Sequence, residues 1–110
     1  EYIKNAPLTY SVAKNALNAY VKLVSKELGN FKIRINAVAP GNILFDGSIW
    51  SKKIKENKNE VKKLLLNDVA LNKLGSTEDI SNLVLLLTSN RSVFTTGSIF
   101  VVDGGQLKGI

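Results

Sequence analysis

The stretch Ile33 to Gly41, which reads IRINAVAPG, decides the fold class of this 110-residue chain. Its centre is short, β-branched and apolar at nearly every position, which is typical of a parallel strand buried on both faces. Pro40-Gly41 then ends the strand, because proline cannot donate to a ladder and glycine favours a turn. We therefore predict a strand over residues 33–39 with a turn at its carboxyl end.

Outward from this strand, the apolar residues recur at the three- and four-residue spacing of helices. Thr9 and Thr77 stand where N-caps are expected, and Gly29 stands where a helix C-cap glycine belongs. A second β-branched run, SIFVV, ends at Asp103. In order, the predicted elements are a helix over residues 8–28, the strand over 33–39, a loop over 42–50, a helix over 51–70, a helix from residue 77 and a strand over 98–102.

Two buried strands joined by helices are the unit of a doubly wound α/β sheet with parallel strands. Two strands are too few for such a sheet, because each strand has two faces and two edges to satisfy. The pattern therefore predicts an α/β fold that is incomplete on its own.

The composition limits the available chemistry. The chain has no histidine, which excludes an imidazole base or ligand, and no cysteine, which excludes disulfides, thiolate nucleophiles and the common zinc sites. We therefore predict no metal site. The absence of cysteine also fits a reducing compartment, so a cytoplasmic location is expected.

The chain is basic, with a formal net charge of +6. Much of the excess lies in Lys52 to Lys63, where Glu56 and Glu60 are interspersed and no aromatic residue is available to stack on a base. We therefore expect no nucleic-acid partner. The longest apolar run, Leu83 to Leu87, is far shorter than the roughly 20 residues of a membrane span, so no membrane partner is expected either.

Tyr10 and Lys14 are the strongest candidates for chemistry once histidine and cysteine are excluded. They stand four residues apart on a predicted helix and therefore project from the same face. A free phenol has a pKa of about 10 and transfers protons poorly near pH 7, but a nearby ammonium favours its charged form. The same spacing also arises when an aromatic ring merely lies beside a surface lysine, so both interpretations stay open.

Four motifs, in order, resemble those of the classical short-chain dehydrogenases/reductases. Tyr10-Ser11-Val12-Ala13-Lys14 is similar to the family's Tyr-x-x-x-Lys active-site motif. The other three are the strand and Pro-Gly turn over residues 33–41, the segment LGSTEDI over 74–80 and the segment TGSIFVVDGG over 96–105. The resemblance covers nearly the whole chain. It implies the C-terminal part of a Rossmann-like doubly wound parallel sheet, with residues 1–110 as the C-terminal segment of a single NAD(P)-binding domain whose N-terminal half is absent.

The resemblance also implies an oxidoreductase that transfers a hydride between NAD or NADP and a small carbonyl or alcohol substrate. Tyr10 would be the general acid in ketone reduction and the base in alcohol oxidation. Lys14 would lower the pKa of this phenol and hydrogen-bond the nicotinamide ribose, and Ile43 would offer its backbone to the carboxamide. The cofactor-binding residues implied in this way are Tyr10, Lys14, Pro40, Gly41, Asn42 and Ile43.

Leu44, Phe45 and Trp50 would form part of the substrate loop. Their apolar character predicts a partly apolar lid, although a sugar could equally stack on Trp50. Family members often carry threonine at the position of Phe45, where it meets the cofactor, so the chain departs from the family pattern there. The resemblance further implies a homo-oligomer, tetramer or dimer, because the helix that carries Tyr10 and the last strand usually form subunit contacts.

None of the eight glycines forms a Gly-x-Gly-x-x-Gly, Gly-x-x-x-Gly-x-Gly or P-loop pattern, and the family's catalytic Ser and Asn would precede residue 1. The fragment alone is therefore expected to be inactive. One alternative is a catalytically inactive fragment or assembly module that keeps the fold elements without activity. Another is a basic nucleic-acid binder, which a salt-dependent gel shift would reveal and which we do not expect.

Overall fold

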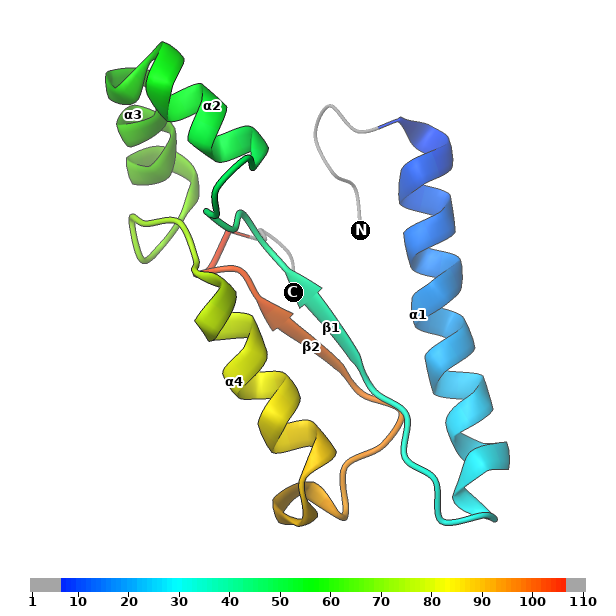
Figure 1. The fold of residues 1–110 in the computed structure, drawn as a ribbon. Helices are drawn as coiled ribbons and strands as arrows, with labels where there is room; N and C mark the ends of the chain where they lie inside the picture. Colours follow the sequence, from blue (N-terminus) through cyan, green and yellow to red (C-terminus); the bar gives the residue numbers. More distant parts are fainter. Residues whose placement is uncertain (1–6, 107–110) are drawn as a thin grey trace.

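The computed structural model describes residues 7–106 as two parallel strands accompanied by helices (Figure 1). This confirms the predicted α/β class. Helices α1 and α4 flank the strands in Figure 1, and α2 and α3 lie beyond the end at which the strands terminate. The elements are α1 (Leu8–Gly29), β1 (Ala37–Pro40), α2 (Ile49–Glu56), α3 (Lys58–Asp68), α4 (Thr77–Thr88), the 3-10 helix η1 (Asn90–Ser92) and β2 (Ile99–Val102).

β1 and β2 pair in parallel, so their carboxyl ends lie at the same edge of the sheet. The register places Ala37 opposite Ile99 and Pro40 opposite Val102. Beyond the last residue of β1, the Gly41 N–H still donates to the Val102 carbonyl at 2.9 Å. The ladder therefore extends into the Pro-Gly turn and holds the start of that turn against β2.

The first predicted strand, over residues 33–39, is shorter and displaced in the structure, where only Ala37–Pro40 form the ladder. The residues that precede β1 are held by side-chain hydrogen bonds. Asn36 donates through Nδ2 to the Thr95 carbonyl at 2.9 Å and accepts through Oδ1 from the Ser98 N–H at 3.2 Å. Such side-chain bonds compete with regular pairing and leave no periodicity in the sequence. The second predicted strand agrees with β2 to within one residue.

The cap predictions for α1 are wrong at both ends. The helix follows Pro7 and has no side-chain cap, so Thr9 lies inside its first turn, and the Pro7 carbonyl accepts from the Ser11 N–H at 3.2 Å. At the other end Gly29 is the last helical residue and has no left-handed conformation. The chain reverses at Lys32, whose φ is 56°.

The single helix predicted over residues 51–70 is two helices, α2 and α3, which pack against each other. They are separated at Asn57, whose extended backbone (φ −155°) ends α2 and whose Oδ1 caps α3 by accepting from the Glu60 N–H at 3.1 Å. Asparagine favours this position because its side chain satisfies an otherwise unpaired N–H at a helix start. Because α2 begins at Ile49, Trp50 lies in its first turn and not in a loop.

Ser76, and not Thr77, caps α4. Its Oγ accepts from the Asp79 N–H at 3.2 Å, and the Asp79 carboxylate accepts from the Ser76 N–H at 2.7 Å, which completes a capping box. The sequence pattern located this helix start to within one residue.

Few side chains within residues 7–106 are buried. The buried apolar ones are Val21, Val61, Val69 and Leu87, whereas large apolar side chains stay exposed on α1, α2, α3, α4 and the segment before β2, where Phe94 is fully exposed. The sheet has two strands and its residues are mostly half-buried. In the described part of the chain, none of the helices has the length and apolar character needed to cross a membrane.

Candidate active site at the carboxyl edge of the sheet

The elements that carry the predicted site residues lie toward one end of the molecule. The amino end of α1, the carboxyl ends of β1 and β2, and α2 all lie toward the same end in Figure 1. In open α/β sheets this edge is where ligands bind, because the loops that follow the strands converge there.

Tyr10 and Lys14 are brought together in the first two turns of α1. The Lys14 Nζ lies 5.3 Å from the centre of the Tyr10 ring, within the range of a cation–π contact. About half of the Tyr10 surface (48%) is exposed. The structure therefore places a phenol and an ammonium on one accessible helix face, as the four-residue spacing predicts.

The Pro-Gly turn is held very close to the end of β2. A Cβ built on Gly41 would lie 2.6 Å from the Cβ of Asp103 and 2.7 Å from its Cα, which no side chain can tolerate. Glycine at this position permits the close backbone approach. Asp103 itself accepts through Oδ1 from the Gly105 N–H at 2.8 Å, so it also shapes the turn that ends β2.

The next residues of this turn are paired with the segment that leads into α4. The Gly75 N–H donates to the Asn42 carbonyl at 2.9 Å, and the Leu44 N–H donates to the Gly75 carbonyl at 2.8 Å. These two bonds form a parallel bridge between Ile43 and Gly75. In such a bridge the N–H and C=O of the central residue point away from the partner. Ile43 thus presents one donor and one acceptor on the side opposite Gly75.

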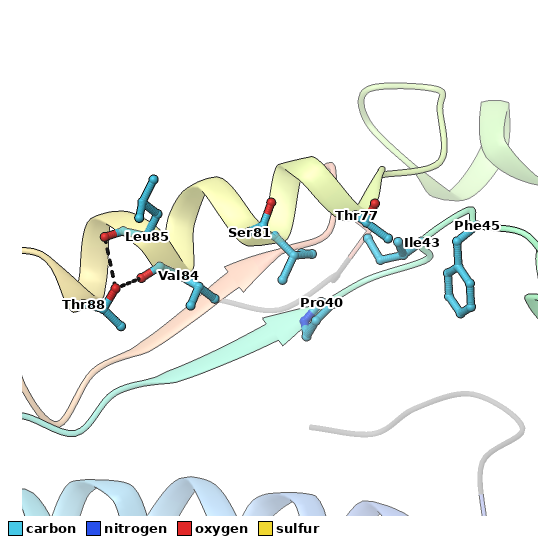
Figure 2. Close-up of a pocket in the computed structure, with 9 residues that line it drawn as sticks. Pro40, Ile43, Phe45, Thr77, Ser81, Val84, Leu85 and Thr88 are labelled. Atoms are coloured by element: carbon cyan, nitrogen blue, oxygen red, sulfur yellow. Dashed lines mark hydrogen bonds between the residues drawn. The ribbon is translucent and has the colours of Figure 1, made fainter.

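An apolar groove of about 640 Å³ lies between this turn and α4. Figure 2 shows Ile43 beside Thr77 at the start of α4, Pro40 at the end of β1 and Phe45 beyond Ile43. Its α4 side runs from Thr77 to Thr88, whose Oγ1 donates back to the Val84 carbonyl at 2.9 Å. Tyr10 does not line this groove.

The predicted substrate-loop residues belong to two elements. Leu44 and Phe45 are exposed in the connection that follows the turn, and Trp50 lies half-buried in the first turn of α2. The buried Ser48 joins them, because its Oγ accepts from both the Phe45 N–H (3.3 Å) and the Ser51 N–H (3.1 Å). Ser48 therefore caps α2 and also fixes the backbone of the connection at Phe45.

Three features near the site escaped the sequence prediction. The Lys53 Nζ lies 4.6 Å from the centre of the Trp50 ring. Residues three apart on a helix are neighbours, so the sequence spacing could have predicted this contact. The Gly75 bridge and the Gly41–Asp103 approach join segments far apart in the chain, and no local pattern could have shown them.

One carboxylate beside the bridge has a perturbed pKa. The Ser76 backbone N–H, and then the Ser76 hydroxyl, donate to Asp79 and hold its pKa below the usual 3.8, with a smaller contribution from the positive charge of Lys73. Hydrogen bonds to the charged form cause such a shift. Asp79 is therefore a charged cap that fixes the start of α4 next to Gly75. Within the described residues no group of three or more acidic side chains could hold a metal ion.

The chain is similar to oxidoreductases in sequence and in structure. Residues 1–106 match the family model described as Enoyl-(Acyl carrier protein) reductase. The chain is 36% identical over 98 residues to an uncharacterised oxidoreductase of Mycobacterium tuberculosis. It is 39% identical over 98 residues to the 3-oxoacyl-[acyl-carrier-protein] reductase of Chlamydia muridarum. These alignments cover 89% and 88% of this chain, but only 38% and 37% of the two relatives.

Among solved structures, the L-sorbose reductase of Gluconobacter frateurii, determined as a complex with NADPH and L-sorbose, superposes with a TM-score of 0.83 at 28% identity. The match covers 96% of this chain and 43% of that protein. The chain therefore spans less than half the length of the proteins it matches.

Proposed function

The chain belongs to the short-chain dehydrogenase/reductase family, and from that premise we propose that the protein containing it is an NAD(P)-dependent oxidoreductase acting on a small carbonyl or alcohol substrate. The observation that carries the proposal is the Tyr10–Lys14 pair on an accessible face of α1, at the end of the molecule where the strands terminate. The L-sorbose reductase, crystallised with NADPH and a ketose, supports both the cofactor class and the substrate class.

In this proposal Tyr10 moves the proton. Its hydroxyl gives a proton to the substrate oxygen during ketone reduction and takes it back during alcohol oxidation. Lys14, whose Nζ lies 5.3 Å from the centre of the Tyr10 ring, is proposed to assist this transfer. This chemistry needs neither histidine nor cysteine, in agreement with the composition.

The residues of the turn fit the nicotinamide end of NAD or NADP. When bound, that ring supplies or accepts the hydride. The outward N–H and C=O of Ile43 match the acceptor and donor of a carboxamide, and Pro40, Gly41 and Asn42 complete the adjoining surface. Lys14 is proposed to hydrogen-bond the ribose. Leu44, Phe45 and Trp50 are proposed to contribute to the substrate side.

We further propose that residues 1–110 form the C-terminal segment of one larger domain, inactive without the remainder. The support is physical: half-buried strands and exposed apolar side chains need further packing partners. Some of the exposed face of α1 is proposed to meet a second copy of the protein in a homo-oligomer. A cytoplasmic location stays a prediction.

The test is oxidation of NADH and NADPH by the full-length protein, followed by absorbance, with small ketones, ketoses and a 3-oxoacyl thioester as substrates. We expect carbonyl-dependent oxidation of one of the two cofactors. Absence of cofactor binding, measured separately by calorimetry, would contradict the proposed function. Binding without turnover would favour the alternative of an inactive assembly module.

A further inference from the structure

Gly75 connects the turn that follows β1 to the start of α4. On one side it is paired through two backbone hydrogen bonds with Asn42 and Leu44. On the other side it precedes Ser76, whose N–H and hydroxyl are both bonded to the Asp79 carboxylate in the first turn of α4. The turn that follows β1 is therefore tied to the start of α4 through this one residue.

The bridge decides where the peptide groups of Ile43 point. Because Asn42 O and Leu44 N face Gly75, the N–H and C=O of Ile43 face the other way. Within residues 7–106, no hydrogen bond involves either group. A donor and an acceptor held side by side in this way suit a planar primary amide.

The absence of a side chain at Gly75 leaves room for Ile43 where the two segments approach. A Cβ built on Gly75 would lie 2.7 Å from Cδ1 of Ile43, closer than side-chain atoms tolerate, although the end of the isoleucine side chain can turn away. Its φ is not in the left-handed region. Glycine at position 75 is thus favoured by the close contact with Ile43 and not by an unusual backbone conformation.

We propose that Gly75 is a positioning residue for the cofactor: its bridge to Asn42 and Leu44 holds the N–H and C=O of Ile43 in the orientation that receives the nicotinamide carboxamide. The inference rests on the proposed function and adds to it a residue that does not itself touch the cofactor.

The experiment compares two ligands on the full-length protein. The reduced cofactor carries the nicotinamide, whereas ADP-ribose (or its 2′-phosphate, if NADPH is preferred) lacks it and retains the rest. Gly75→Pro removes the N–H that donates to Asn42. Its Kd for the reduced cofactor, measured by calorimetry, is expected to rise about tenfold, the effect of one lost hydrogen bond. Its Kd for ADP-ribose is expected to stay within about twofold of wild type.

Gly75→Ala is the milder variant, because the Ile43 side chain can turn to accept the new Cβ. It is expected to raise the Kd of the reduced cofactor about threefold without affecting ADP-ribose, and it carries the test if the proline variant does not fold. Gly29→Ala is the matched control, since a Cβ there meets no atom within 4 Å.

Equal weakening of both ligands would overturn the inference, because it would indicate general damage to the domain. Unchanged binding of both ligands by Gly75→Ala and Gly75→Pro would overturn it too. If the wild-type protein binds neither ligand, the proposed function fails and the inference fails with it.

Discussion

At the scale of single residues, the candidate chemistry depends on two side chains whose relation is local. Tyr10 and Lys14 are four positions apart on one helix, so their proximity needs only that the helix forms. The Lys14 Nζ lies 5.3 Å from the centre of the Tyr10 ring, so a positive charge accompanies the phenol. The proposed proton transfer by Tyr10 would therefore not require a histidine.

Tyr10→Phe deletes only the hydroxyl. In the full-length enzyme we expect turnover to fall by about 10²- to 10⁴-fold, the usual contribution of a general acid, with little change in the Kd for the cofactor. Tyr20→Phe, on the same helix and similarly exposed (56%), is the matched control and should keep wild-type turnover. Steady-state kinetics and calorimetry give the two quantities, and near-normal turnover by Tyr10→Phe would exclude the proposed role.

Asp79 makes the cap of α4 sensitive to acid. Its pKa is lowered from 3.8 in the folded protein by the Ser76 N–H and hydroxyl, so its charge stabilises the fold fully above pH 3.8 and loses this effect as the pH falls through the lower folded value. Asp79→Asn should therefore be destabilised relative to wild type at pH 5 to 7, and the difference should shrink below pH 3.8.

Urea denaturation of the full-length protein across this pH range measures the difference. Asp46→Asn, in the exposed connection before α2, serves as the control for removing one carboxylate. A gap between Asp79→Asn and wild type that stays constant down to the lowest pH would contradict the assignment.

At the scale of elements, Arg34 joins the end of α4 to the segment before β1. Its Nη1 donates to the Leu87 carbonyl at 2.6 Å and to Ser92 Oγ at 3.2 Å, and its Nη2 donates to the Ser89 carbonyl at 3.2 Å. A cation at a helix carboxyl end also interacts favourably with the helix dipole. Arg34 thereby sets how α4 lies relative to β1, and with it the position of the turn.

Arg34→Met keeps most of the side-chain volume but removes these donors. We expect it to lower the free energy of unfolding of the full-length protein by about 2 kcal/mol, within the range for hydrogen bonds to charged groups. Arg91→Met, at an exposed position in η1, should change stability far less. Urea midpoints for the two variants provide the comparison, and equal midpoints would show that the Arg34 contacts contribute nothing specific.

At the scale of the whole molecule, this chain has too little buried surface for its many apolar side chains. Val21, Val61, Val69 and Leu87 are its buried apolar residues within the described range, while side chains such as Leu23 and Phe94 stay exposed. Exposed apolar surface and open strand edges both favour association. This exposed apolar surface is the observation behind the proposal that residues 1–110 pack against further chain in a larger domain.

When residues 1–110 are produced alone, we expect them to associate and to lack fixed tertiary packing. We expect elution ahead of the 12.0 kDa monomer on gel filtration, strong binding of a hydrophobic dye and a weak near-ultraviolet circular dichroism signal. The full-length protein, handled identically, is the control. A monomeric, cooperatively unfolding 110-residue chain would instead support the assembly-module alternative.

The sequence predicted the element types and their order, because apolar periodicity reports which face of each element is buried. It overestimated the first strand and joined α2 to α3, since Asn36 and Asn57 redirect the backbone through side-chain hydrogen bonds that periodicity does not register. Thr9, Gly29 and Thr77 are residue types that often cap helices, but none of them is the cap residue in the structure. The first helix instead follows Pro7, its chain reverses at Lys32, and Ser76 caps α4.

By itself, the sequence determined the α/β class, the four ordered family motifs and the pairing of Tyr10 with Lys14, all of which depend on local spacing. Only the tertiary structure decided that Gly75 pairs with the Ile43 turn, that Gly41 packs onto Asp103 and that Arg34 reaches a carbonyl 53 residues away. The physical reason is that these contacts depend on where separate elements come to lie. Local periodicity carries no information about that placement.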